Sequence, residues 1–178
     1  MDDIADKLGC SKKTLYVFFE NRKDLVLKVI SNDMKKHELD ISNVIAEKLH
    51  PIEEILNLNV IAINKLKTCH PSFQYDLKKY YPQSWNIFDK KNRQLTYKVS
   101  IQNLKKGIKE GCYRKEINPE IISKIFSEKI DVIFNSLAFE AINVSFSDVY
   151  KELINHHVLG IVNEEGRKYY LNFQKTTK

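Results

Sequence analysis

Residues that break helices are sparse in this chain, and this sparseness restricts its fold more than any other feature. Its 178 residues include five glycines and four prolines, and most segments between them carry apolar residues at helical spacing. Convincing examples of the alternating pattern of half-buried strands are absent from these segments. We therefore expect an all-α protein whose helices begin and end near the glycines and prolines.

Capping residues predict where the first helices begin and end. A short helix is expected over residues 2–8, and Gly9 ends it because glycine tolerates a positive φ. Ser11 is a good N-cap for a second short helix, and Asn21 is one for a third. The apolar residues of the third helix keep a period near 3.6 to about Lys48, which predicts a long rod between two domains.

The rest of the chain predicts a helical domain over residues 49–178, after a first domain over residues 1–48. Pro51 fits the first turn of a helix, as does Pro119 after the capping residue Asn118. A short aromatic helix is expected over residues 73–81, a long helix before Gly111, and a very apolar one over residues 121–142. A last helix is expected over residues 148–162, capped by Ser147 or a neighbour. The tail from Arg167 is expected to be only partly ordered.

Composition excludes several classes of protein and favours few. Three distant cysteines without a metal-ligand spacing predict reduced thiols and no metal site. No leader-like or membrane-spanning apolar run is found, so we expect a cytoplasmic protein. No GxSxG, P-loop or HExxH motif occurs, so we expect no enzyme activity, catalytic residue or cofactor. The net charge of +6 permits an anionic partner but is common without one.

Residues 2–25 have the proportions of a helix-turn-helix, whose second helix enters the major groove of DNA. Hydrogen-bond donors for DNA cluster at the starts of two neighbouring helices, and with the capping serine they are Ser11, Lys12, Lys13, Thr14, Tyr16, Arg22 and Lys23. The alternative for the two lysines is an ordinary solvated helix face. Tyr16 has the alternative of packing between domains, and Cys10 is expected under the turn. Leu15 and Phe18 are predicted to be core residues.

Residues 4–25 resemble the motif of TetR/AcrR-type transcriptional regulators, which here reads IAdklGcSkkTLYvfFenRkdL. The resemblance implies a cytoplasmic homodimer whose last two major helices pair with those of a second copy. It also implies central helices that enclose a pocket for a small molecule, and a double-stranded DNA operator as partner. Thr14, Tyr16 and Arg22 would hold the DNA backbone, and Lys12 and Lys13 would lie nearest the bases.

The resemblance also implies one further helix, ahead of residue 2, which would cover an apolar surface that includes Ile4, Leu8, Leu15 and Phe18. If Met1 is the true start, leaving that surface uncovered costs roughly 1.5 to 3 kcal/mol for each large side chain. Three explanations for its absence stay open: loss from the gene, trimming from the protein, or a start codon assigned too far downstream. We then expect weak DNA binding by this polypeptide and stronger binding by a longer version. The alternative function is a ligand-binding or interaction protein of the same fold that has lost DNA binding.

Aromatic residues gather in the middle of the chain, on several expected helices. Rings from several helices line many apolar ligand pockets, although such a stripe is more often plain core. With the resemblance, the candidate pocket residues are Phe73, Tyr81, Trp85, Phe88, Tyr97 and Phe126. The expected ligand is a small, largely apolar or aromatic compound.

Wide apolar stripes on the later helices predict burial against a second copy, in a bundle of four helices. The candidate interface residues are Ile122, Ile125, Ile133, Phe134, Leu153, Ile154 and His157. His156 and His157 point about 100° apart on a helix, so they cannot chelate a metal as a pair, and we expect one interfacial and one exposed histidine. A ligand that tilts the rod over residues 22–48 would change the spacing of the two recognition helices, which DNA requires to be about 34 to 36 Å.

Overall fold

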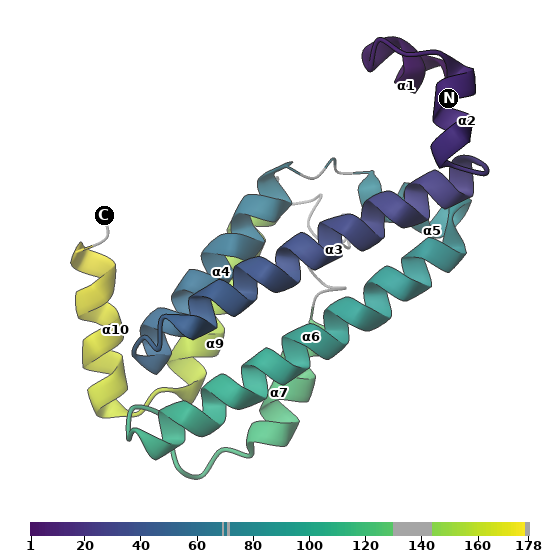
Figure 1. The fold of residues 1–178 in the computed structure, drawn as a ribbon. Coiled ribbons are helices and arrows are strands. Elements are labelled where there is room, and N and C mark those ends of the chain that lie inside the picture. The colour runs from purple at the N-terminus through teal and green to yellow at the C-terminus, as the bar shows by residue number, and fades with distance from the viewer. Residues whose placement is uncertain (69, 71, 130–143, 177–178) are drawn as a thin grey trace.

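The computed structural model describes residues 1–68, 70, 72–129 and 144–176. Within these residues the chain forms nine helices and no strand, as predicted from its periodicity (Figure 1). The helices are α1 (Asp2–Lys7), α2 (Lys12–Phe18), α3 (Arg22–Ala46), α4 (Pro51–Thr68), α5 (Phe73–Tyr80), α6 (Pro82–Lys109), α7 (Pro119–Glu128), α9 (Phe146–Ile161) and α10 (Glu164–Thr176).

Side-chain caps stand at the start of several of these helices. Each capping hydrogen bond joins residues that are close neighbours in the sequence. The side chains of Ser11, Asn21 and Asn118 each accept a hydrogen bond from a backbone N–H three residues later, at 3.0 Å. These three predicted caps are confirmed. Helix α9 is capped by Ser145, which accepts from the N–H of Asp148 at 3.2 Å.

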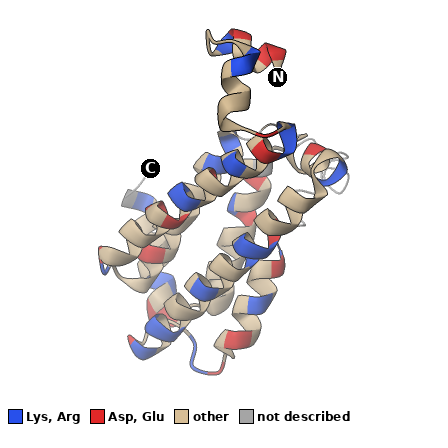
Figure 2. Cartoon of the chain, turned by 45° about the vertical axis from the view of Figure 1, so that its right-hand side comes forward, with Lys and Arg blue, Asp and Glu red and all other residues tan. Residues whose placement is uncertain are grey.

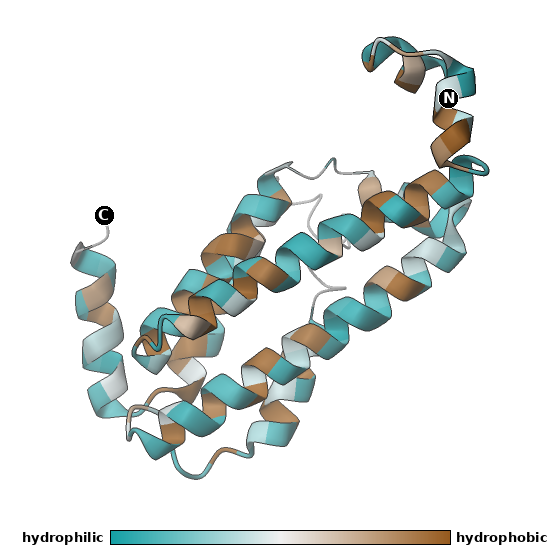
Figure 3. Ribbon diagram, viewed as in Figure 1, coloured by the Kyte–Doolittle hydropathy of each residue, from teal (hydrophilic) through white to brown (hydrophobic). Residues whose placement is uncertain are grey.

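The first two helices project beyond one end of the bundle, and α3 runs from them along its whole length (Figure 1). Helix α3 packs against α4 and α6, α6 against α5 and α7, and α4 against α9. Apolar and polar residues are interspersed along each of these helices, as expected for helices that bury one face (Figure 3). Helices α1 and α2 are therefore connected to the bundle by one continuous helix, α3.

The bundle has two buried clusters. One lies around Ile52, Leu104, Tyr113 and Val158, between α4, α6 and α9, at the end away from α1 and α2. The other joins α3, α5 and α6 through Ile30, Met34, Leu77 and Phe88.

The tail from Arg167 was predicted to be only partly ordered, and this was wrong. Residues 164–176 form helix α10, which packs against α4. Tyr170 is 2% exposed, and its hydroxyl donates to Oδ1 of Asn155 at 3.0 Å. The ring of Tyr169 stacks on His50 at 4.0 Å. These contacts join parts of the chain that are distant in sequence, so local pattern did not predict them.

The predicted apolar helix over residues 121–142 is described only as far as α7 extends, so its remainder lies outside the described residues. None of the helices in the described part of the chain is long and apolar enough to cross a membrane.

Candidate nucleic-acid interface and ligand cavity

The turn between α1 and α2 depends on Gly9, whose φ of +63° lies in the left-handed region that favours glycine. Its N–H donates to the carbonyl of Asp6, and the N–H of Cys10 donates to the carbonyl of Ala5. Ser11 then begins α2. The two short helices are thus joined as a helix-turn-helix, as the sequence predicted.

A small core holds α1 against α2. Met1, Ala5 and Leu15 are buried there, and the half-buried Cys10 and Phe19 pack against them. Leu15 is therefore a core residue and is not left uncovered.

The prediction that Phe18 is a core residue was wrong, because its side chain is 65% exposed. Phe19 packs against this small core instead. Leu8 is 66% exposed and Val17 is 75% exposed. Much of the apolar surface of this unit therefore faces solvent.

The side chains proposed from sequence to contact DNA are all exposed. They lie on α2 and its N-cap and on the first turn of α3, at the end that projects from the bundle, and are Ser11, Lys12, Lys13, Thr14, Tyr16, Arg22 and Lys23. Figure 2 shows basic residues on this unit together with acidic ones. Tyr16 is 45% exposed, so the alternative of packing between domains does not describe it.

Lys12 has an ion pair with Asp2, with Nζ and Oδ2 at 3.0 Å. The hydrogen bond raises the pKa of Lys12 and lowers the pKa of Asp2. Both side chains are exposed, and such surface pairs contribute little. A phosphate group can therefore replace Asp2 as the partner of Lys12 at little cost.

The start of α3 is fastened to the end of α2. The carboxylate of Asp24 accepts from the N–H of Glu20 at 3.0 Å and from Nζ of Lys28 at 2.9 Å. Lys28 also donates to the carbonyl of Phe18 at 3.0 Å and lies over the ring of Phe19. These contacts couple the orientation of α2 to that of α3.

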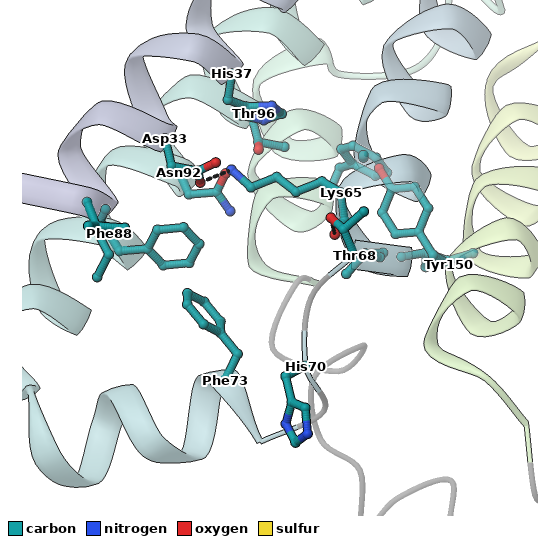
Figure 4. Close-up of a pocket in the computed structure, with 16 residues that line it drawn as sticks. Asp33, His37, Lys65, Thr68, His70, Phe73, Phe88, Asn92, Thr96 and Tyr150 are labelled. Carbon is teal, nitrogen blue, oxygen red and sulfur yellow. Dashed lines mark hydrogen bonds and ion pairs between the residues drawn. The ribbon is translucent and has the colours of Figure 1, made fainter. Parts of the chain in front are cut away.

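A cavity of about 390 Å³ lies within the bundle, in the size range of small-molecule sites (Figure 4). It is lined by residues of α3, α4, α5, α6, α7 and α9 and by His70, which precedes α5. Its lining residues are Val29, Ile30, Asp33, His37, Ala62, Lys65, Leu66, Thr68, His70, Phe73, Phe88, Asn92, Thr96, Phe126, Tyr150 and Leu153.

The structure places three of the six candidate pocket residues at this cavity, namely Phe73, Phe88 and Phe126. Tyr81 and Trp85 instead pack against the cluster around Phe88. Tyr97 lies at a separate hollow between α6 and α7, beside Ile121 and Ile125. These three residues therefore do not line this cavity, although aromatic side chains near them in the sequence do.

Sequence reasoning missed the polar residues of the cavity. Nζ of Lys65 on α4 lies 2.7 Å from Oδ2 of Asp33 on α3, and His37 lies one turn further along α3. Burial, with the nearby charge of Lys65, lowers the pKa of His37. The spacing of Asp33 and His37 by four residues was a usable signal, since it puts both on one face of α3.

The predicted interface residues are spread over different environments. Ile125 is 48% exposed, Ile122 is half-buried, and Leu153 lines the cavity. Ile133 and Phe134 lie outside the described residues.

Ile154 and His157 were predicted to lie in a dimer interface, but they are already buried within one protomer. They are 4% and 6% exposed. The ring of His157 stacks on Phe126 at 4.3 Å, while His156 is exposed. Burial lowers the pKa of His157 to about 4. No group of three or more potential metal-ligating side chains is found among the described residues.

Comparison with known proteins finds regulators. The chain is 24% identical over 138 residues to YvaF of Bacillus subtilis (strain 168), an uncharacterized HTH-type transcriptional regulator, and this covers 76% of the chain and 70% of YvaF. No family model matches the chain.

Two solved structures share its fold. The ketosteroid transcriptional regulator KstR2 of Mycobacterium tuberculosis has a TM-score of 0.63 at 17% identity, over 91% of this chain and 84% of KstR2. The fatty acid degradation regulator FadR from Bacillus halodurans has a TM-score of 0.66 at 16% identity, over 88% of this chain and 82% of FadR. The chain therefore has the all-α fold of these regulators, with a helix-turn-helix and a helical C-terminal domain.

Proposed function

We propose that this chain is a transcriptional regulator that binds operator DNA as a homodimer, and that a small ligand in the cavity modulates its affinity for DNA. One observation carries the proposal. The exposed donors of α2 and of the start of α3 lie on a projecting helix-turn-helix, and α3 continues from there into the cavity wall.

In this proposal α2 is the recognition helix, and it enters the major groove with its first turn foremost. Lys12 and Lys13 lie nearest the bases. Thr14, Tyr16, Arg22 and Lys23 donate to phosphate oxygens, which fixes the position of α2 on the duplex. Ser11 caps α2 and leaves its side chain exposed at the same surface.

The homodimer supplies the second recognition helix, and the two must be about 34 to 36 Å apart to reach successive major grooves. Ile121 and Ile125 on α7 are exposed apolar side chains, at 57% and 48%, available to a second copy. A dimer through the later helices leaves α1 and α2 free, because they project from the other end of the bundle (Figure 1).

The proposed ligand is small and mainly apolar, because the cavity wall contains the rings of Phe73, Phe88 and Phe126 and several aliphatic side chains. KstR2 is described as a ketosteroid regulator and FadR as a fatty acid degradation regulator. Ketosteroids and fatty acids are both mainly apolar compounds. A ligand that moves α3 changes the placement of α2 and weakens DNA binding without touching the DNA.

The proposal is tested by selecting bound sequences from a pool of randomised duplex DNA, at low salt because phosphate contacts are then strongest. The expected result is an enriched site with two inverted half-sites about one helical turn apart, and a mobility shift on that site. A pool that stays random after repeated rounds contradicts the DNA-binding role.

A further inference from the structure

The ion pair between Lys65 and Asp33 stands at the wall of an otherwise mainly apolar cavity (Figure 4). Nζ of Lys65 also lies 6.0 Å from the centre of the Phe88 ring. Among the described lining residues, these two are the Lys, Arg, Asp or Glu side chains. An anionic ligand in this cavity must therefore compete with Asp33 for Lys65, and a cationic ligand must compete with Lys65 for Asp33.

The two partners differ in how well water already solvates them. The side chain of Asp33 is 55% exposed, whereas that of Lys65 is 33% exposed. An anion that takes the place of Asp33 leaves a carboxylate that solvent can reach. A cation that takes the place of Lys65 leaves an unpaired ammonium group on the less exposed of the two side chains, where an unpaired charge costs more. The asymmetry favours an anionic ligand.

The remaining polar groups suit orientation more than charge. The lining includes Thr68, Asn92 and Thr96, which offer neutral hydrogen bonds. The hydroxyl of Tyr150 is already committed, since it donates to Oδ1 of Asn59 at 2.7 Å. His37 carries little positive charge at neutral pH, because burial lowers its pKa. Among the described lining residues, Lys65 is thus the Lys or Arg side chain that an anionic group can pair with.

We propose that this cavity takes a ligand with an apolar body and one carboxylate-like group, and that this group replaces Asp33 as the partner of Lys65. The inference rests on the proposed ligand role of the cavity and adds the chemical class of the ligand. It also gives the ligand a direct effect on the fold. Lys65 belongs to α4 and Asp33 to α3, so binding breaks an ion pair between these helices, and α3 leads to the recognition helix.

The chain carries its own reporter for the test. Its single tryptophan, Trp85, lies 5.8 Å from the ring of Phe88, which lines the cavity. Titrations followed by Trp85 fluorescence compare three probes of equal chain length: decanoate, 1-decanol and decylammonium. We expect decanoate to bind more tightly than either of the others.

The variant Lys65→Met removes the charge and keeps most of the apolar stem. It is expected to weaken decanoate binding by about tenfold or more and to leave decanol binding within about twofold, as for the loss of one charge-assisted hydrogen bond. Asp33→Asn is expected to tighten decanoate binding, because Lys65 loses its competing carboxylate. Lys67→Met, an exposed lysine on the same helix that does not line the cavity, is the matched control and should bind decanoate as the unmodified protein does.

Equal affinities for decanoate and decanol, tighter binding of decylammonium, or no fluorescence change with any probe would overturn the inference. These titrations contain no DNA, so they fail or succeed independently of operator binding. A decanoate site that depends on Lys65, in a protein that selects no DNA sequence, would support the ligand class and count against the regulator.

Discussion

The backbone of Gly107 on α6 lies against the ring of Tyr113, so closely that an added Cβ would stand 2.2 Å from Cδ2 of the ring. Tyr113 has no exposed surface, and its hydroxyl, whose single hydrogen the two acceptors share, lies 2.8 Å from Oδ1 of Asn103 and 3.1 Å from the carbonyl oxygen of Pro51. The ring therefore joins the end of α6 to the start of α4. This contact fixes the bundle at the end opposite the helix-turn-helix.

Gly107→Ala should destabilise the protein by about 1–3 kcal/mol, because the new methyl group overpacks against a ring that is itself hydrogen-bonded in place. Gly160→Ala is the matched control on α9, where an added Cβ meets nothing within 4 Å. There the change should be neutral or stabilising by up to about 1 kcal/mol. Urea unfolding measures both, and equal stabilities for the two variants would refute the contact.

Lys106 and Lys105 are neighbours whose ion pairs should differ greatly in value. Nζ of Lys106 donates to Glu54 at 2.7 Å and to the carbonyl of Leu49, and the side chain of Glu54 is 7% exposed. Lys106→Met leaves this carboxylate with Asn103 as its remaining partner, and should cost about 2–4 kcal/mol of unfolding free energy.

The pair of Lys105 and Glu120 is exposed on both sides. Lys105→Met should therefore cost little unfolding free energy, and clearly less than Lys106→Met. Urea unfolding in one buffer measures the unfolding free energy of both variants. A similar loss in both would contradict the claim that the buried Glu54 carboxylate depends on Lys106.

His157 should make the protein less stable in weak acid. Its pKa is lowered to about 4 by burial, whereas in the unfolded chain it is near 6.5. The unfolded state therefore takes up a proton as the pH falls below about 6.5, while the folded state does so only near pH 4. The stabilising contribution is present above pH 6.5 and is lost on the way to pH 4, by up to about 3 kcal/mol.

The variant His157→Phe keeps an aromatic ring against Phe126 and cannot be protonated, so its unfolding free energy should fall less steeply between pH 6.5 and 4. His156→Gln, at the exposed neighbouring position, should keep the original slope. The measurement is a series of urea titrations across that pH range. An unchanged slope in His157→Phe would show that other groups cause the acid sensitivity.

The features that sequence predicted best are those decided by near neighbours. Ser11, Asn21 and Asn118 cap helices because their side chains reach a backbone N–H three residues away. Gly9 adopts a positive φ for an equally local reason. Helix starts and the turn of the helix-turn-helix follow from such short-range chemistry.

The features that sequence missed depend on partners distant along the chain. Helix α10 forms where Tyr170 meets Asn155 and where Gly166 lies against the backbone of Cys112, at positions that no periodicity identifies. His157 was assigned to an interface, although Phe126 covers it within the protomer. An apolar stripe shows that a helix face is covered but does not show by what.

The cavity shows the same division. Phe73, Phe88 and Phe126 were candidates because aromatic residues are conspicuous in a sequence. Asp33 shares a face of α3 with His37, but its ion-pair partner Lys65 lies on α4, and the two are brought to 2.7 Å only by the fold. Pairs of charges across a cavity wall are therefore found by structure and not by motif.

The most direct test of the central claim, that the α2–α3 surface binds duplex backbone, is the salt dependence of binding to the selected DNA site. We predict that Arg22→Ala and Lys23→Ala each weaken binding and each reduce the slope of log K against log[salt] by about 1, the amount expected for one phosphate contact. Lys98→Ala, an exposed lysine on α6, should bind with the original affinity and slope. Unchanged binding by the first two variants, or an equal loss in all three, would contradict the account.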